Sequence, residues 1–247
     1  MKWDKTVSVT GADLACRAEG PGAGAPWVVF SNSLVTNYGI WEPQAKALLN
    51  TYNVLRYDQR GHGQSTATTD PMNFTILGSD LLAVMDAAGT ERGAGVGLSM
   101  GVPTTLAAYE MAPERFTRLV FVDGMARTAP TGAATWAERI AFATENGMEA
   151  LSRATAERWL QPDAPEKMVA ALRAMVGAIP LEGFVQCARA LQGYDYFAVS
   201  QALDLPVLAI AGANDGAMPD TMQRVFGALP RARMELAREE IATCAIS

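Results

Sequence analysis

The sequence predicts an α/β fold with a mainly parallel sheet flanked by helices. Short, continuous apolar runs recur along the chain, as is typical of strands that are buried on both faces of a parallel sheet. Segments with apolar residues at helical spacing separate these runs, and glycine-rich turns follow several of them. Strands that alternate with helices in this way specify an α/β architecture. The clearest apolar runs are residues 27–30, 53–57, 119–122 and 206–210.

The remaining elements of the core follow from local patterns. A strand pair is expected first, because residues 6–10 and 14–18 lie on either side of the turn Gly11-Ala12-Asp13. The other expected elements are a helix over 74–88 that Gly89 ends, a strand of small residues over 93–96, a helix over 102–109 and a last strand over 233–236.

A wholly helical segment separates the last two long apolar runs. From about Arg127 to Leu203 the periodicity predicts helices over 136–143, 148–159, 165–176 and 181–191. We therefore expect a helical lid, residues 127–203, inserted into a core domain that comprises residues 1–126 and 204–247. The aromatic and methionine side chains of this lid either line a pocket or, as is commoner, pack the lid against the core.

Composition narrows the class of protein. The chain has 247 residues, of which 49% are hydrophobic and 19% charged, as in an ordinary globular protein. The net charge of −6 argues against nucleic acid or an anionic membrane surface as a partner and leaves a small neutral molecule open. Neither a signal-peptide core nor a run long enough to cross a bilayer occurs, so we expect a cytoplasmic protein.

The cysteine and histidine counts argue against a disulfide framework, a zinc site and a catalytic metal. Cys16, Cys187 and Cys244 are odd in number and far apart, which favours reduced thiols over a disulfide framework or a zinc site. His62 is the only histidine in the sequence, so a catalytic metal is not expected. The chemistry is therefore expected from side chains and backbone groups alone.

A nucleophile motif stands in the middle of the chain. Residues 97–101 read Gly-Leu-Ser-Met-Gly, the Gly-x-Ser-x-Gly pattern of a serine on a sharp turn between a strand and a helix. The predicted strand before it and the predicted helix after it supply that context. Glycine on either side of the turn at Ser99 removes side chains that would clash where strand and helix cross. The alternative is a chance match in a glycine-rich loop.

Two carboxylates follow predicted strands at the same edge of the sheet. Asp215 lies in the loop Gly-Ala-Asn-Asp-Gly after the strand at 206–210, where a carboxylate could orient an imidazole. Alternatively, it caps the helix that begins near Pro219 or fixes the turn. Asp123, at the end of the strand at 119–122, is a reserve acid whose commoner role would be in a solvated turn.

A serine nucleophile also needs backbone N–H groups that stabilise the negative oxygen of a tetrahedral intermediate. The residue after the nucleophile supplies one of them, which here is Met100. The loop after an early strand supplies the other. That loop reads Ser-Asn-Ser-Leu-Val-Thr over residues 31–36, and Ser33 or Leu34 would present the N–H group.

Five segments together carry a resemblance to a known family: Phe-Ser-Asn-Ser-Leu at 30–34, Trp-Glu-Pro-Gln at 41–44, Leu-Arg-Tyr-Asp-Gln-Arg-Gly-His-Gly at 55–63, Gly-Leu-Ser-Met-Gly at 97–101 and Gly-Ala-Asn-Asp at 212–215. As a set they resemble the 3-oxoadipate enol-lactonase branch of the α/β-hydrolase superfamily. The resemblance implies a cofactor-free hydrolase that opens a lactone or ester through an acyl-serine. It assigns the nucleophile to Ser99 and the acid to Asp215. It assigns the oxyanion N–H groups to Met100 and to Ser33 or Leu34.

Two features depart from that family's pattern. Val102 stands where these lactonases tend to have a further glycine. The family's histidine lies about 25 to 30 residues past the acid, and residues 239–247 contain none. Glu240 and Cys244 fall near that place, but a carboxylate of ordinary pKa is a weak base toward a serine hydroxyl, and solvated tail residues are the commoner interpretation. His62 lies in an Arg-Gly-His-Gly turn, for which the resemblance implies a structural role.

Three functions stay open on these grounds. The first is an ester or lactone hydrolase of low efficiency, because losing the histidine costs a serine hydrolase about a million-fold in turnover, while the oxyanion hole and binding retain roughly 10³ to 10⁴ over water. The second is a non-hydrolytic enzyme, a cyclase or lyase, and the third is a non-catalytic binding protein.

The closing helix of the fold is also absent from the sequence, so we expect a homo-oligomer or a partner to cover the apolar sheet face.

Overall fold

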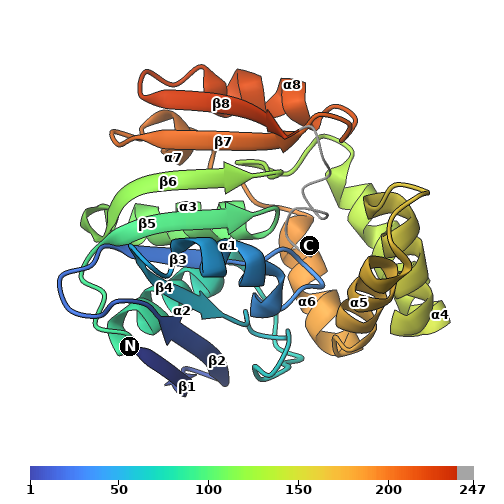
Figure 1. Ribbon diagram of the computed structural model, residues 1–247. Coiled ribbons are helices and arrows are strands. Elements are labelled where there is room, and N and C mark those ends of the chain that lie inside the picture. The colour runs from blue at the N-terminus through green and yellow to red at the C-terminus, as the bar shows by residue number, and fades with distance from the viewer. Residues whose placement is uncertain (238–247) are drawn as a thin grey trace.

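The computed structural model describes residues 1–237 and has the α/β fold that the sequence predicts. The strands are β1 (Lys2–Val9), β2 (Ala12–Glu19), β3 (Trp27–Ser31), β4 (Asn53–Tyr57), β5 (Gly93–Leu98), β6 (Phe116–Val122), β7 (Val207–Gly212) and β8 (Ala232–Ala237). They form one sheet in the order β1-β2-β4-β3-β5-β6-β7-β8, with helices on both faces (Figure 1). The pairings of β2 with β1 and with β4 are antiparallel, and the others are parallel.

The parallel part of the sheet brings the carboxyl ends of β3, β5, β6 and β7 to one edge. The register pairs Ser31 with Gly97 where β3 and β5 end. It pairs Val122, the last residue of β6, with Leu98 on one side and Ile210 on the other. In open α/β sheets, ligands bind outside this carboxyl edge. The loops that carry the predicted site residues therefore meet at one place.

Four α-helices within residues 1–237 belong to the core: α1 (Glu42–Leu48), α2 (Phe74–Ala87), α3 (Gly101–Met111) and α8 (Met218–Met222). α2 begins after Asn73, whose Oδ1 accepts a hydrogen bond from the backbone N of Ile76 at 2.9 Å. α1 is not evident from the sequence, because seven residues that include Pro43 give no helical periodicity. The turn between β1 and β2 is shorter than expected, since Thr10 and Gly11 alone connect them, with Gly11 at φ 77°.

The lid comprises α4 (Gly132–Trp159), α5 (Glu166–Gly177), α6 (Leu181–Leu191) and α7 (Phe197–Gln201), which lie between β6 and β7 in the chain. Figure 1 shows α4, α5 and α6 grouped at the end of the molecule toward which the parallel strands point. α4 unites two predicted helices across a kink at Gly147, whose φ is 81°. By length and composition no single described helix could span a membrane, while α5 and α6 pass that test only as a pair bent by 89°.

Most large side chains of the lid pack rather than point into open space. Phe184 is fully buried, and Met168 is 9% exposed. Both belong to an apolar cluster that joins the lid to α2 through Phe74 and Leu77. Phe142, at 40% exposure, is the exception among the large lid side chains. The packing interpretation of the lid aromatics therefore holds for most of them.

The lid meets the core closely at two facing glycines. A Cβ atom on Gly61 would lie 2.8 Å from Cα of Gly183, and one on Gly183 would lie 2.2 Å from the backbone O of Gly61. Beside them, Sγ of Cys187 donates to the backbone O of Arg60 at 3.6 Å. Helix α6 therefore rests directly on the turn that contains Arg60 and Gly61.

Candidate active site

The Gly-x-Ser-x-Gly segment forms a tight turn between β5 and α3. Ser99 has a left-handed backbone with φ 51°, which is costly for a residue other than glycine. A Cβ atom on Gly97 would lie 2.3 Å from the backbone O of Gly101, and one on Gly101 would lie 2.2 Å from the backbone O of Ser31. Only glycine fits at both places, so the surrounding backbone fixes the turn that presents Ser99 at the carboxyl edge.

The departure at Val102 is accommodated by the loop after β6. The Val102 side chain is fully buried in the first turn of α3. A Cβ atom on Gly124 would lie 2.5 Å from Cγ2 of Val102, so the valine occupies the space that a side chain at position 124 would need. Val102 therefore packs against the bare backbone of Gly124 beside the serine turn.

The loop after β3, which carries the predicted second oxyanion donor, is held by buried polar side chains. Nδ2 of Asn32 donates to the backbone O of Tyr57 at 2.9 Å, and its Oδ1 accepts from Nε1 of Trp41 at 2.9 Å. Nε2 of Gln59 donates to the backbone O of Asn32 at 2.6 Å. Ser33 and Leu34 are each 3% exposed. These bonds fix the backbone from which Ser33 or Leu34 would present its N–H group.

His62 belongs to the same support. Its Nε2 accepts a hydrogen bond from the backbone N of Val35 at 3.1 Å, and its Nδ1 lies 3.2 Å from the backbone O of Arg60. Because Nε2 is the acceptor, the proton is on Nδ1, which donates to Arg60. Full burial lowers the pKa of His62 to about 4, so the ring is neutral near pH 7. Both ring nitrogens are occupied, which supports a structural role.

The two predicted carboxylates differ in how they are held. Asp123 follows β6 with φ 42°, and its Oδ1 accepts from the backbone N of Gly212 at 3.0 Å. Burial, reinforced by the charge of Asp215, raises the pKa of Asp123 to about 6. Asp123 is therefore not in a fully solvated turn, which corrects the expectation from sequence. Asp215 is exposed and does not cap α8, since the residue at that cap is Ala217.

Backbone strain is concentrated at this edge of the sheet. Within residues 1–237, the non-glycine residues with positive φ are Val35, Ser99 and Asp123. They follow β3, β5 and β6, which are successive neighbours in the sheet. Residues held in such conformations cluster at functional sites, because the surrounding structure must over-determine them. The structure thus brings the loop with the predicted oxyanion donors, the turn at Ser99 and the two predicted carboxylates to one edge of the sheet, where three of these backbone positions are strained.

Comparison with known proteins places this geometry in a family. A family model described as the alpha/beta hydrolase fold matches residues 26–241. The chain belongs to the α/β-hydrolase fold family. It is 33% identical over 197 residues to 3-oxoadipate enol-lactonase 2 of Acinetobacter baylyi, which covers 78% of this chain and 73% of that protein. It is 32% identical over 210 residues to 3-oxoadipate enol-lactonase 1 of the same organism, which covers 83% of this chain and 77% of that protein.

A solved structure agrees with these relatives. The enol-lactonase from Burkholderia xenovorans has a TM-score of 0.90 with this α/β hydrolase at 31% identity, covering 97% of this chain and 93% of that one. The resemblance inferred from five short segments is therefore confirmed across the fold. The place where the family's histidine is expected, with Glu240 and Cys244, lies outside the described residues.

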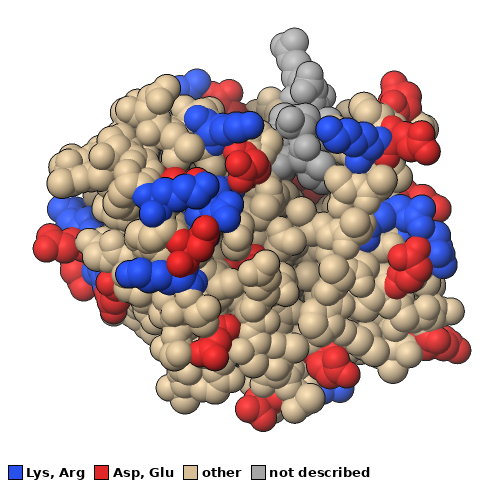
Figure 2. Space-filling model, turned by 60° about the horizontal axis from the view of Figure 1, so that its bottom comes forward, with Lys and Arg blue, Asp and Glu red and all other residues tan. Residues whose placement is uncertain are grey.

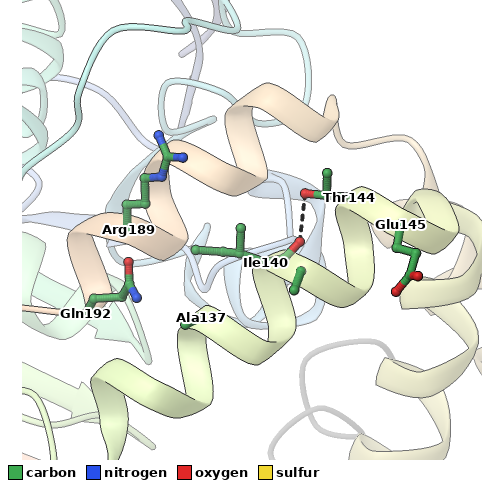
Figure 3. Close-up of a pocket in the computed structure, with 7 residues that line it drawn as sticks. Ala137, Ile140, Thr144, Glu145, Arg189 and Gln192 are labelled. Atoms are coloured by element: carbon green, nitrogen blue, oxygen red, sulfur yellow. Dashed lines mark hydrogen bonds between the residues drawn. The ribbon is translucent and has the colours of Figure 1, made fainter.

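A surface groove on the lid of this α/β hydrolase is separate from the site. It runs between α4 and α6 (Figure 3), and its lining residues are Ala137, Ile140, Ala141, Thr144, Glu145, Arg189 and Gln192. The Thr144 hydroxyl donates to the backbone O of Ile140 at 2.8 Å, so it is engaged within its own helix. The groove contains no predicted site residue and no group arranged as a nucleophile.

Charged side chains give no sign of a polyanion or metal site in the described part of the chain. On the face in Figure 2, Lys and Arg side chains are interspersed with Asp and Glu, and no continuous basic area forms. Arg56, for example, pairs with Glu19 at 2.6 Å and with Glu42 at 2.7 Å. No group of three or more His, Cys, Asp or Glu residues within 1–237 could hold a metal ion.

Proposed function

We propose that this α/β hydrolase cleaves carboxylic esters or lactones through an acyl-serine on Ser99. The observation that carries the proposal is the left-handed turn at Ser99, at the end of β5 and the start of α3. This geometry projects a serine hydroxyl from the carboxyl edge and aims the following backbone N–H, that of Met100, at the same space. The enol-lactonase relatives favour an enol-lactone or a similar small ester as the substrate class.

The chemistry proceeds in two stages. Oγ of Ser99 attacks the carbonyl carbon while the developing oxyanion accepts hydrogen bonds from Met100 N–H and from Ser33 or Leu34 N–H. The tetrahedral intermediate then expels the alcohol or enol and leaves an acyl-serine. Water attacks the acyl carbon in the second stage and releases the acid. Each stage needs a group that removes a proton and later returns it.

Proton transfer is the slow part of this mechanism in the 247-residue chain. His62 is the only histidine in the sequence, and both of its nitrogens are engaged by backbone groups. Asp215, assigned as acid by the resemblance, orients a base but is not itself an efficient one. We therefore propose slow turnover, carried by the oxyanion hole and substrate binding, which retain roughly 10³ to 10⁴ over water without a triad.

The commitment of His62 also favours a second candidate. A cyclase or lyase, or a protein that only binds its ligand, needs the oxyanion donors and pocket but no general base for water. Incubation with candidate enol-lactones, followed by mass spectrometry of the products, distinguishes these functions. A catalysed product that has not gained water indicates the non-hydrolytic enzyme, and unchanged but bound ligand indicates a binding protein.

The direct test compares wild-type protein with Ser99→Ala. We expect a fluorophosphonate to add its phosphonyl mass to the wild type alone, and 4-nitrophenyl acetate to be cleaved slowly by the wild type and not by the variant. Ester cleavage that is equal in both proteins would overturn the assignment of Ser99. A homo-oligomer stays a separate prediction, which light scattering at several concentrations checks.

A further inference from the structure

We infer that Gln59 and Thr104 are positioning residues of this site. Together they fix the loop after β3, which carries one proposed oxyanion donor, relative to the turn at Ser99, which carries the other. The inference rests on the proposed function, because it concerns the N–H groups that would bind the oxyanion. It goes beyond that function by naming two buried side chains that align those N–H groups.

An oxyanion hole needs two N–H groups aimed at one point. Each donor must lie about 2.7–3.1 Å from the place that the negative oxygen will occupy. Here the proposed donors belong to two separate segments, residues 32–36 and residues 99–105. Within residues 1–237, no hydrogen bond joins these two segments directly. The alignment of the donors therefore depends on indirect links.

The Gln59 side chain supplies such a link. Its Nε2 donates to the backbone O of Asn32 at 2.6 Å, and its Oε1 accepts from Oγ1 of Thr104 at 3.1 Å. The orientation of the amide is fixed, because the carbonyl oxygen of Asn32 can only accept a hydrogen bond. One amide group thus holds the loop after β3 on one side and helix α3 on the other.

The bond to Asn32 also sets the direction of an N–H group. The carbonyl of Asn32 and the N–H of Ser33 belong to one planar, trans peptide unit, so the N–H points away from Gln59. The next unit is also held, because its carbonyl, that of Ser33, accepts from Oγ1 of Thr36 at 2.9 Å. Its N–H is that of Leu34. Both candidate donors of this loop therefore lie in peptide units whose carbonyl oxygens are anchored.

Thr104 connects Gln59 to the turn at Ser99. Its Oγ1 lies 3.1 Å from Oε1 of Gln59 and 3.0 Å from the backbone O of Met100, so its single proton is shared between two acceptors. Met100 is the other proposed donor and directly precedes α3. Thr104 therefore ties the Gln59 amide to the residue whose N–H would meet the oxyanion.

Burial keeps this bridge intact. Gln59 is 1% exposed, and Asn32 and Thr104 are fully buried. Water cannot replace a lost partner in such surroundings, and an unpaired buried polar group costs free energy. The bridge is therefore a fixed part of the fold rather than one of several exchangeable contacts.

The neighbouring Thr105 provides a matched control. It is also fully buried, and its Oγ1 donates to the backbone O of Gly101 at 2.7 Å, one turn back in the same helix. Within residues 1–237 this hydroxyl makes no hydrogen bond outside α3. Removing it tests the loss of a helical hydroxyl without the loss of the bridge.

Apolar packing is the alternative way to align the donors. Leu34, Val35 and Met100 belong to one buried apolar cluster, which could hold the two segments together without hydrogen bonds. The two explanations differ for Thr104→Val, which replaces a hydroxyl by a methyl group. Packing predicts an unchanged rate, and the bridge predicts a loss.

The experiment compares 4-nitrophenyl acetate with the matching thionoester, in which sulfur replaces the carbonyl oxygen. Attack by Ser99 places the negative charge on oxygen in the first and on sulfur in the second. Because sulfur is a weak hydrogen-bond acceptor, aligned N–H groups favour the oxygen ester. We therefore expect the wild type to prefer the oxygen ester more strongly than hydroxide does in solution. A wild type with the same preference as hydroxide would overturn the inference.

The variants test the bridge itself, with cleavage by Ser99→Ala subtracted as background. We expect kcat for the oxygen ester to fall about tenfold in Thr104→Val and in Gln59→Leu, with KM changed less than about twofold. The thionoester rate should fall much less, so the preference shrinks. Thr104→Ser, which keeps the hydroxyl, and Thr105→Val should both stay within about threefold of the wild type.

Two further comparisons separate positioning from folding. A partly unfolded variant loses both rates in proportion, so the ratio of the two rates does not depend on the folded fraction. The double variant of Gln59→Leu with Thr104→Val should lose no more than the larger single loss, because both changes break one bridge. A loss equal to the product of the single losses would overturn the inference.

The remaining outcomes distinguish this inference from the proposed function. An unchanged preference in Thr104→Val and Gln59→Leu, or an equal loss of preference in Thr105→Val, would refute the role of the bridge alone. Ester cleavage that is equal in the wild type and Ser99→Ala would refute the proposed function, and the inference with it.

Discussion

The two sides of Ser99 are built differently. On the oxyanion side, the loop after β3 is held by Asn32, Gln59 and His62, all of them buried and hydrogen-bonded to backbone or side-chain groups. On the acid side, one side-chain hydrogen bond, accepted from the backbone N of Gly212, holds the Asp123 carboxylate, and the Asp215 side chain has none among the described residues. The loop that carries the proposed oxyanion donors is therefore held by several buried side chains, while the proposed carboxylates depend on few contacts within the described residues. The comparison predicts which substitutions lower the free energy of unfolding and which lower the catalytic activity.

The largest change in the free energy of unfolding is expected from His62→Ala, on the oxyanion side of Ser99. The variant leaves Val35 N–H without its partner, leaves Arg60 C=O with the Cys187 thiol alone, and opens a cavity. We expect the free energy of unfolding to fall by about 3–5 kcal/mol at pH 8 in urea titrations. His62→Gln, whose amide supplies both a donor and an acceptor, should lose less. A loss below about 1 kcal/mol in His62→Ala would remove the basis of the comparison.

The same residue should make the wild type sensitive to acid. The pKa of His62 is about 4 in the fold and 6.5 in the unfolded chain. Protons therefore bind the unfolded chain first, and stability that is fully present above pH 6.5 is lost as the pH falls toward 4, by up to about 3 kcal/mol. Unfolding measured from pH 8 to pH 4 should show a shallower decline in His62→Gln than in the wild type.

On the acid side, Asp123→Asn should stabilise the protein at pH 8. The pKa of Asp123 is raised from 3.8 to about 6, so the fold binds this proton better than the unfolded chain does. Stability from this group therefore falls as the pH rises from 4 to 6, and the ionised carboxylate costs about 1–3 kcal/mol above that range. Asparagine cannot ionise and keeps an acceptor for Gly212 N–H. The gain in the free energy of unfolding should vanish at pH 4. A variant that is less stable than the wild type at pH 8 would show that the ionised carboxylate stabilises the fold instead.

Between the two sides, Ser99→Gly should raise stability by about 1 kcal/mol, because glycine adopts φ 51° without strain. Ser99→Ala keeps the strain and is the matched control, with an expected change near zero. Thermal melts of the three proteins give the comparison. Equal stability of the glycine and alanine variants would mean that the turn stores no strain.

The smallest effect is expected from Asp215→Asn. The side chain is exposed and makes no hydrogen bond among the described residues, so the free energy of unfolding should change by less than about 0.5 kcal/mol at any pH from 5 to 8. A larger loss in urea titrations would show that the acid side is held more firmly than its contacts indicate.

The sequence predicts some of these features because they depend on neighbours in the chain. The turn at Ser99 follows from two nearby glycines and the strand and helix around them, and the mainly parallel sheet follows from the alternation of strands and helices, although the order of its strands was not predicted. The environment of Asp123 could not be predicted, because it depends on the backbone of Gly212, which is 89 positions away. For His62 the resemblance implied a structural role, but not that Val35, 27 positions away, would occupy Nε2. α1 was missed because a seven-residue helix carries too little periodicity.

The facing glycines at positions 61 and 183 have a consequence for exchanging lids between relatives. The turn that carries Gly61 touches α6 on one side and, through His62, the loop after β3 with the proposed oxyanion donors on the other. A transplanted lid with any side chain at the position of Gly183 would push that turn away and shift the backbone at Val35. In a chimaera, residues 60–63 should therefore be exchanged together with the lid. The backbone of the loop with the proposed oxyanion donors then keeps its position.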